Sequence, residues 1–149
     1  MAVENPRLLP TKRLLDFGQG FYLTSNLEQA RKWAFRTRAI REAGIPTISA
    51  FEFDNNILKQ LDVLIFNFPD KDWLRYVAAN RTGQVTKLYD IVLGPVANDQ
   101  TIRTVNDFLN GYLSEEIAIQ LLLPQKLKDQ YAFKTDNALR HLYYKETIE

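Results

Sequence analysis

The sequence predicts a single α+β domain over residues 1–149, with a mainly antiparallel sheet and flanking helices. With 149 residues, of which 46% are hydrophobic, the chain can bury roughly two-thirds of its unfolded surface in one core. It contains no internal repeat, low-complexity tract or linker that would divide it. Strand and helix patterns are mixed irregularly along the chain, whereas strict alternation would favour a parallel sheet. These three observations together favour the α+β class.

Six short segments have the composition of β-strands, with β-branched and aromatic residues bounded by turn formers. The clearest is TISAFEF at 47–53, where Ile48 and Ala50 lie opposite Phe51 and Phe53, as in a half-buried strand. The predicted strands are 20–24, 47–53, 62–67, 89–94, 130–134 and 141–147.

Four segments have helical patterns with recognisable ends. Ser25 followed three residues later by Glu28 predicts a capping box that opens the helix at 26–43. Gly44 with Pro46 shortly after it is a standard signal for the end of that helix. The other predicted helices are 71–81, 99–110 and 115–122. Their predicted N-caps are Asp70, Asn98 or Asp99, and Ser114.

Composition excludes several classes of function. A formal net charge of +1 gives no general attraction to nucleic acid or to an anionic membrane. The absence of cysteine and the single histidine exclude a disulfide framework and a thiolate metal site, so no metal is expected. No stretch reaches 18 consecutive apolar residues, and the N-terminus lacks the apolar run of a signal peptide. We therefore expect a cytoplasmic protein with no membrane partner.

The segment DFGQGFYLTSNLEQARKW at 16–33 is the most informative part of the sequence. Gly18 and Gly20 stand at the entrance of a predicted strand, where glycine permits a positive φ or the close approach of a ligand. Tyr22 lies on that strand and Trp33 about two turns into the following helix, so the two rings can clamp a flat ligand ring. Aromatic residues at such positions also commonly pack in a core, and both interpretations stay open.

The segment DFGQGFYLTSNLEQARKWA resembles the glycine-glycine-x-tyrosine segment of ADP-ribosyltransferases, the superfamily of poly(ADP-ribose) polymerases and several bacterial toxins. The whole chain resembles a bacterial family catalogued only as a domain of unknown function within that superfamily. The matching stretches are DFGQGFYLT, WA at 33–34, NR at 80–81, YDIVLGPVAND at 89–99 and QYAFKT at 130–135. The resemblance implies an ADP-ribosyltransferase-like fold with a split, mainly antiparallel sheet, and NAD as the substrate.

The resemblance also implies roles for particular residues. Tyr22 matches the strand tyrosine that stacks on nicotinamide in the polymerase-like branch of the superfamily. Trp33, 11 positions later, matches the aromatic residue on the other face of that ring. With Gly18 and Gly20, these residues form the implied cofactor-binding set.

Two departures from the family pattern bear on activity. QYAFKT resembles the strand that carries a glutamate orienting the ribose hydroxyl, which places Gln130 at the glutamate position, directly after Asp129. Glutamine cannot carry the negative charge that strengthens such a hydrogen bond. Relatives also begin with a strand that carries a histidine-glycine pair, whereas here Met1-Ala2-Val3 leads directly into ENPRLLP. We therefore expect the first strand to be missing.

By resemblance, the protein is an NAD-dependent mono-ADP-ribosyltransferase-like protein with Tyr22 and Gln130 as its catalytic residues. It would serve as the toxin of a toxin–antitoxin or defence pair, with a protein target or antitoxin as its partner. The two departures predict that it is weak or inactive on NAD in this form. The alternative is a non-catalytic relative that binds a nucleotide or a protein partner.

Three further motifs each have a structural and a functional interpretation. Asp90, Asn98 and Asp99 either form turns and caps or cluster at a sheet edge beside a pocket. Arg81 either stabilises a helix C-terminus or holds a substrate phosphate. His141 lies outside any nucleophile constellation, so a surface or packing role is expected for it.

Overall fold

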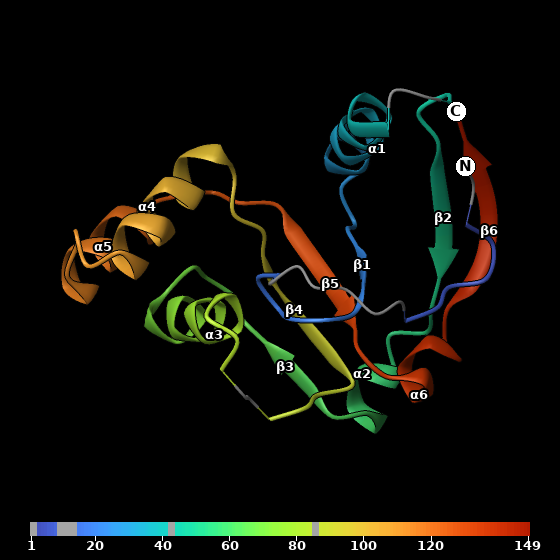
Figure 1. The fold of residues 1–149 in the computed structure, drawn as a ribbon. Helices are drawn as coiled ribbons and strands as arrows, with labels where there is room; N and C mark the ends of the chain where they lie inside the picture. Colours follow the sequence, from blue (N-terminus) through green and yellow to red (C-terminus); the bar gives the residue numbers. More distant parts are fainter. Residues whose placement is uncertain (1–2, 9–14, 42–43, 85–86) are drawn as a thin grey trace.

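The computed structural model describes residues 3–8, 15–41, 44–84 and 87–149, which form an α+β fold with two sheets and flanking helices (Figure 1). The strands are β1 (Phe21–Leu23), β2 (Ile48–Glu52), β3 (Val63–Ile65), β4 (Ile91–Pro95), β5 (Asp129–Phe133) and β6 (Tyr143–Ile148). The helices are α1 (Leu27–Arg41), α2 (Ile57–Gln60), α3 (Lys71–Arg81), α4 (Asp99–Leu109), α5 (Glu115–Leu122) and α6 (Asp136–Leu139).

All predicted strands and helices form, with ends within two residues of those expected from the sequence. Residues 42 and 43, the last two of the helix predicted at 26–43, lie outside the described residues. The four-residue helices α2 and α6 were not expected.

The larger sheet has four strands in the order β1-β5-β4-β3, and β2 pairs with β6 in a separate two-stranded sheet. Of the four pairings in the described part of the chain, three are antiparallel and only β3–β4 is parallel. The parallel pair is joined by α3, because parallel neighbours need a crossover connection. The predicted α+β class with flanking helices is therefore confirmed, and the larger sheet is mixed, with one parallel and two antiparallel pairings.

The two central strands, β4 and β5, are buried on both faces of the larger sheet. Ile91 opposes Phe133 on one face, and Val92 opposes Ala132 on the other. All four residues are fully buried. This two-sided burial explains the almost uninterrupted apolar run of β4.

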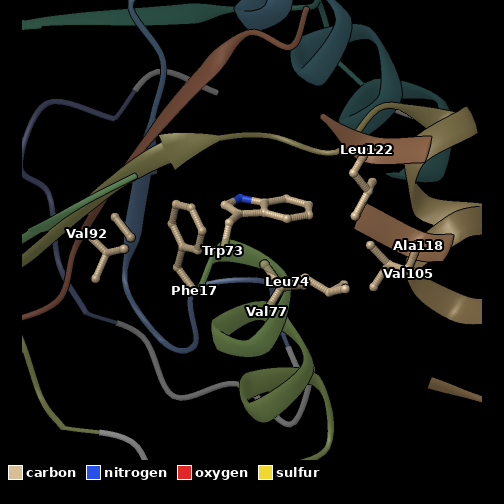
Figure 2. Close-up of a cluster of buried hydrophobic side chains, with 9 residues drawn as sticks. Phe17, Trp73, Leu74, Val77, Val92, Val105, Ala118 and Leu122 are labelled. Atoms are coloured by element: carbon tan, nitrogen blue, oxygen red, sulfur yellow. The ribbon is translucent and has the colours of Figure 1, made fainter. Parts of the chain in front are cut away.

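Helices α3, α4 and α5 lie on one side of this sheet (Figure 1). The core on this side is centred on the fully buried Trp73 of α3, which packs with Phe17, Val92 and residues of α4 and α5. Figure 2 shows the Trp73 indole between Phe17 and Val92 on one side and Leu122 on the other. The indole Nε1 donates a 2.9 Å hydrogen bond to the carbonyl of Pro95 at the end of β4. Trp73 thus ties α3 to the central sheet.

The β2–β6 pair, together with α2 and α6, covers the opposite side of the sheet. Phe133 of β5 packs here against Phe53, with ring centroids 5.6 Å apart in a T-shaped arrangement. Phe21 of β1 packs similarly on Phe51, at 5.7 Å. Alternate residues of β1 therefore belong to different cores, since Tyr22 packs on the opposite side with the helices.

Three predicted helix caps are confirmed. The side chains of Asp70, Asn98 and Ser114 accept hydrogen bonds from the backbone of the first turns of α3, α4 and α5. The capping box predicted at Ser25 is wrong, because Asn26 accepts the hydrogen bond from the Gln29 N–H, at 2.8 Å. Ser25 hydrogen-bonds instead to the Asp129 carboxylate on β5.

Candidate functional site

The glycine pair that precedes β1 forms a tight turn. Gly18 has a φ of +79° and donates its N–H to the Leu15 carbonyl at 3.0 Å. A Cβ on Gly18 would lie 2.8 Å from Asn80 Oδ1 and 2.9 Å from Lys134 Nζ, and one on Gly20 would lie 3.2 Å from the Phe133 carbonyl. Packing therefore accounts for both glycines without a ligand, because protein atoms occupy the space beside each of them.

Lys134 holds this turn against β5. Its ammonium group donates to the Phe17 carbonyl and, at 3.1 Å, to the Gln19 carbonyl. Burial lowers the pKa of Lys134 below the ordinary value for lysine. The two hydrogen bonds hold the ammonium group beside main-chain oxygens of the glycine turn, and they fix the path of the chain into β1.

The Tyr22 side chain points back toward the glycine turn. Its hydroxyl accepts a hydrogen bond from the Phe17 N–H at 3.1 Å and donates one to the Gly18 carbonyl. Burial raises the pKa of the Tyr22 phenol well above its ordinary value, and the nearby charge of Asp16 acts in the same direction. The phenol is therefore neutral and held in place by the turn.

The raised pKa of Tyr22 predicts a loss of stability at high pH. In the unfolded chain the phenol ionises near pH 10, whereas in the folded chain it stays protonated, so above about pH 10 the folded state binds more protons. The stability that Tyr22 contributes should be present below about pH 10 and decline above it. We expect the difference in free energy of unfolding between the wild type and Tyr22→Phe to shrink between about pH 9 and pH 11, measured by urea denaturation.

The control for this pH dependence is Tyr112→Phe, because the Tyr112 side chain is 78% exposed. A pH dependence seen with Tyr22→Phe and absent with Tyr112→Phe is specific to the buried phenol. Parallel pH profiles for the wild type and Tyr22→Phe would contradict the assignment.

Gln130 lies on β5, on the same face of the sheet as Tyr22. Tyr22 pairs with Ala132, and Gln130 is two residues before Ala132, so the two side chains are diagonal neighbours. Gln130 is only 4% exposed. Its amide Nε2 has no hydrogen-bond partner among the residues that the structure describes. The two residues that the sequence analysis proposed as catalytic therefore share one face of the sheet, although the Tyr22 side chain points toward the glycine turn, and Gln130 offers a buried, unsatisfied donor.

Asp129, the neighbour of Gln130, has a structural role. Its carboxylate accepts hydrogen bonds from the Thr24 hydroxyl at 3.0 Å and from the backbone N–H of Ser25 at 2.9 Å. The Thr24 hydroxyl also contacts the Asp129 carbonyl, at 2.8 Å. These contacts fix the end of β1 and the entrance of α1 against β5.

A cavity of about 740 Å³ opens between the two sheets, and the sequence did not predict it. Its walls come from segments far apart in the chain: the end of β1, the end of β2, the middle of β5 and the start of β6. The lining residues are Leu23, Thr24, Ser25, Phe51, Glu52, Phe53, Asp54, Asn55, Tyr131, Leu142 and Tyr143.

A smaller cavity, of about 140 Å³, lies beside the first turn of α1. Three lysines line it: Lys32 on α1, and Lys126 and Lys128 on the segment before β5. Asn26 and Asn98, the N-caps of α1 and α4, line it as well. Glu28 also lines it, so the described lining holds three cationic side chains and one carboxylate, and this excess of positive charge suits an anion.

Trp33 is half-buried on α1. Neither Trp33 nor Tyr22 lines either of these two cavities. The clamp of two aromatic rings therefore stays a prediction.

The remaining sequence candidates have structural roles. Arg81 ends α3, and its Nε donates to the Asp16 carboxylate at 2.6 Å. Of the two interpretations of Asp90, Asn98 and Asp99, the structure supports turns and caps, because Asp90 precedes β4 whereas the other two follow its far end. The Asp90 carboxylate accepts from the backbone of Asp62 at 3.0 Å and from the Thr135 hydroxyl at 2.6 Å. It thereby ties β3, β4 and the chain after β5 together.

His141, the single histidine, is half-buried between α6 and β6.

Within the described ranges no group of three or more acidic or histidine side chains is arranged to hold a metal ion. In the same ranges no helix has the length and apolar character needed to cross a membrane.

Comparison with known proteins identifies a family. The sequence model of the family described as "Protein of unknown function (DUF3990)" matches residues 1–144. The chain therefore belongs to this family. No curated protein and no solved structure gives a significant match.

Proposed function

We propose that this member of the DUF3990 family is an NAD-dependent mono-ADP-ribosyltransferase-like protein that is weak or inactive in its present form. The observation that carries the proposal is the placement of Tyr22 and Gln130 as diagonal neighbours on one face of the sheet. These are the two residues for which the sequence resemblance implies catalytic roles. A protein target or an antitoxin would be the partner of such a protein.

The buried amide of Gln130 is an argument for a polar ligand at this face of the sheet. An unsatisfied buried donor costs about 1–3 kcal/mol, so a ligand that supplies an acceptor has a specific advantage here. A ribose hydroxyl or a carboxamide oxygen is such an acceptor, and NAD carries both. The contact that we propose is a hydrogen bond from Gln130 Nε2 to one of these oxygens.

The smaller cavity provides positive charge that can attract the phosphates of the same ligand. Lys128 is two residues before Gln130 in the chain, and with Lys32 and Lys126 it lines the cavity of about 140 Å³. A pyrophosphate carries two negative charges, which the three lysines attract more strongly than the carboxylate of Glu28 in the same lining repels them. We propose that this cavity receives the phosphates of NAD.

The low activity that we propose has two physical causes. Gln130 is neutral, and a neutral hydrogen bond stabilises developing charge less than a carboxylate does. The glycine turn is also occupied by Asn80 and Lys134, so its backbone is not open to a ligand. Both observations favour the alternative candidate as well, a non-catalytic relative that binds a nucleotide or a protein.

The experiment is nicotinamide release from NAD, combined with NAD titration by calorimetry. We expect NAD binding by the unmodified chain, little or no release, and weaker binding by Tyr22→Ala. Gln130→Glu should raise the rate by about fivefold, because a charge-assisted hydrogen bond exceeds a neutral one by roughly 1 kcal/mol. The matched control is Gln120→Glu, the same chemical change at an exposed position on α5.

The outcomes separate the candidates. Rapid release by the unmodified chain that Tyr22→Ala abolishes would overturn the low-activity part of the proposal and establish an active enzyme. No NAD binding by the unmodified chain would overturn the NAD proposal and leave the protein-binding alternative. Because Gln130 is buried, circular dichroism must show that Gln130→Glu is folded; the titration of the unmodified chain does not depend on any variant.

A further inference from the structure

The large cavity between the two sheets is separate from the face that carries Tyr22 and Gln130. It is lined by Leu23 and Tyr131, which alternate with Tyr22 and Gln130 along β1 and β5. Side chains alternate between the two faces of a strand, so the cavity opens on the opposite face of the sheet. Its volume of about 740 Å³ falls within the range of organic-ligand sites.

Aromatic rings form much of the wall of this cavity. Phe51 and Phe53 come from β2 and the residue that follows it, Tyr131 from β5 and Tyr143 from β6. Phe53 and Tyr131 lie 5.7 Å apart in a T-shaped pair, which fixes both rings. Tyr143 is 66% exposed although it is a large aromatic residue, so its ring is available at the opening.

Two charged residues stand among the described residues that line the cavity, and both are carboxylates. Glu52 pairs with Lys145 at 3.0 Å, but this ion pair is exposed, with side chains 63% and 58% accessible. Asp54 accepts a hydrogen bond from the Asn56 N–H through Oδ1 at 2.9 Å. A carboxylate has about four acceptor positions, so both groups can accept further hydrogen bonds.

The negative charge of Asp129 lies next to the inner wall of the cavity. Its carboxylate binds Ser25, which lines the cavity. Burial raises the pKa of the Tyr131 phenol, and the charge of Asp129 adds to this effect. Among the described residues that line the cavity there is no lysine or arginine, and Lys145 reaches Glu52 from outside this lining. The site therefore disfavours anions such as phosphate.

We propose that this cavity binds a planar organic cation, a guanidinium or amidinium group, which stacks on the aromatic wall and pairs with Glu52 and Asp54. A planar guanidinium stacks on aromatic faces, donates in a fixed fork to carboxylates and is less strongly hydrated than an ammonium group. The cavity offers aromatic rings on which a guanidinium can stack, and carboxylates with further acceptor positions for its forked hydrogen bonds. The site is independent of the NAD proposal, because it uses other side chains on the other face of the sheet.

The test compares two ligands of the same shape and different charge. Benzamidine is a cation at neutral pH and benzamide is its neutral analogue, and calorimetry measures the affinity of the folded protein for each. We expect benzamidine to bind about tenfold more tightly than benzamide, and raised salt to weaken benzamidine alone. Because benzamide also resembles the nicotinamide of NAD, both titrations are made with saturating NAD present. Equal or tighter binding of benzamide under this condition, or no binding of benzamidine at millimolar concentration, would overturn the proposal.

Variants locate the site. The double variant Glu52→Gln/Asp54→Asn retains the Asn56 hydrogen-bond acceptor and should weaken benzamidine about tenfold, with benzamide unaffected. The matched control is Asp72→Asn/Glu116→Gln, which removes the same charge from exposed positions on α3 and α5. Unchanged benzamidine affinity in the first double variant, or equal losses in both, would overturn the assignment.

Two further probes identify the source of the cation. Agmatine represents a free small guanidine, and acetyl-Gly-Arg-Gly-amide represents an arginine side chain of a protein. Tighter binding of agmatine supports a metabolite, whereas tighter binding of the peptide supports a protein ligand. Failure of both guanidines to bind would overturn the proposal for the guanidinium class.

Discussion

Replacing Trp73 with alanine is expected to lower the free energy of unfolding by about 3–5 kcal/mol. Trp73 is fully buried at the centre of the core between α3, α4, α5 and the sheet. The substitution removes the largest fully buried side chain and leaves a cavity among Phe17, Val92 and Leu122. It also removes the 2.9 Å hydrogen bond to the Pro95 carbonyl. Urea denaturation followed by circular dichroism measures the loss.

Two variants separate the causes of this loss. Trp73→Phe keeps most of the apolar volume but leaves the Pro95 carbonyl without its donor, which should cost about 1–3 kcal/mol. Phe35→Ala removes a ring that is 59% exposed on α1 and should change stability by no more than about 0.5 kcal/mol. Comparable losses for Trp73→Ala and Phe35→Ala would show that Trp73 does not anchor the core.

The regular elements were predictable because their signals are local. Asp70 and Ser114 have the side chains that helix starts require, and each accepts the expected hydrogen bond. α2 and α6 were missed because four residues are too few to show helical periodicity. Ser25 was mistaken for a cap because its competing partner, Asp129, lies 104 residues away in the sequence.

The candidate site was predictable only in part, because strand register is a long-range property. The sequence placed Tyr22 and Gln130 on two strands, but only the pairing of Tyr22 with Ala132 puts them on one face. The two glycines were expected to permit a positive φ or the close approach of a ligand, yet Lys134, directly after β5, occupies the space beside Gly18. The large cavity had no sequence signal, since its walls come from four separate segments.

Replacing Gly18 with alanine is expected to cost about 2–4 kcal/mol of unfolding free energy, from backbone strain and crowding together. At a φ of +79° an alanine is strained by about 1–2 kcal/mol. Its Cβ would also lie 2.8 Å from Asn80 Oδ1 and 2.9 Å from Lys134 Nζ. Neither group moves freely, because Asn80 Nδ2 donates to the Tyr76 carbonyl and Lys134 donates to Phe17 and Gln19.

Gly111→Ala is the matched control, because Gly111 has a φ of +81° and a Cβ there meets no atom within 4 Å. Gly111→Ala introduces the backbone strain without the crowding, so it should lower the free energy of unfolding by about 1–2 kcal/mol. The difference between the two variants in urea denaturation therefore measures how tightly Asn80 and Lys134 close the turn. Equal losses would mean that these side chains yield at little cost, and that the backbone beside β1 is accessible to a ligand after all. A larger loss for Gly18→Ala would instead assign the glycine to packing, so that any nucleotide must bind through Tyr22 and Gln130 rather than through the turn.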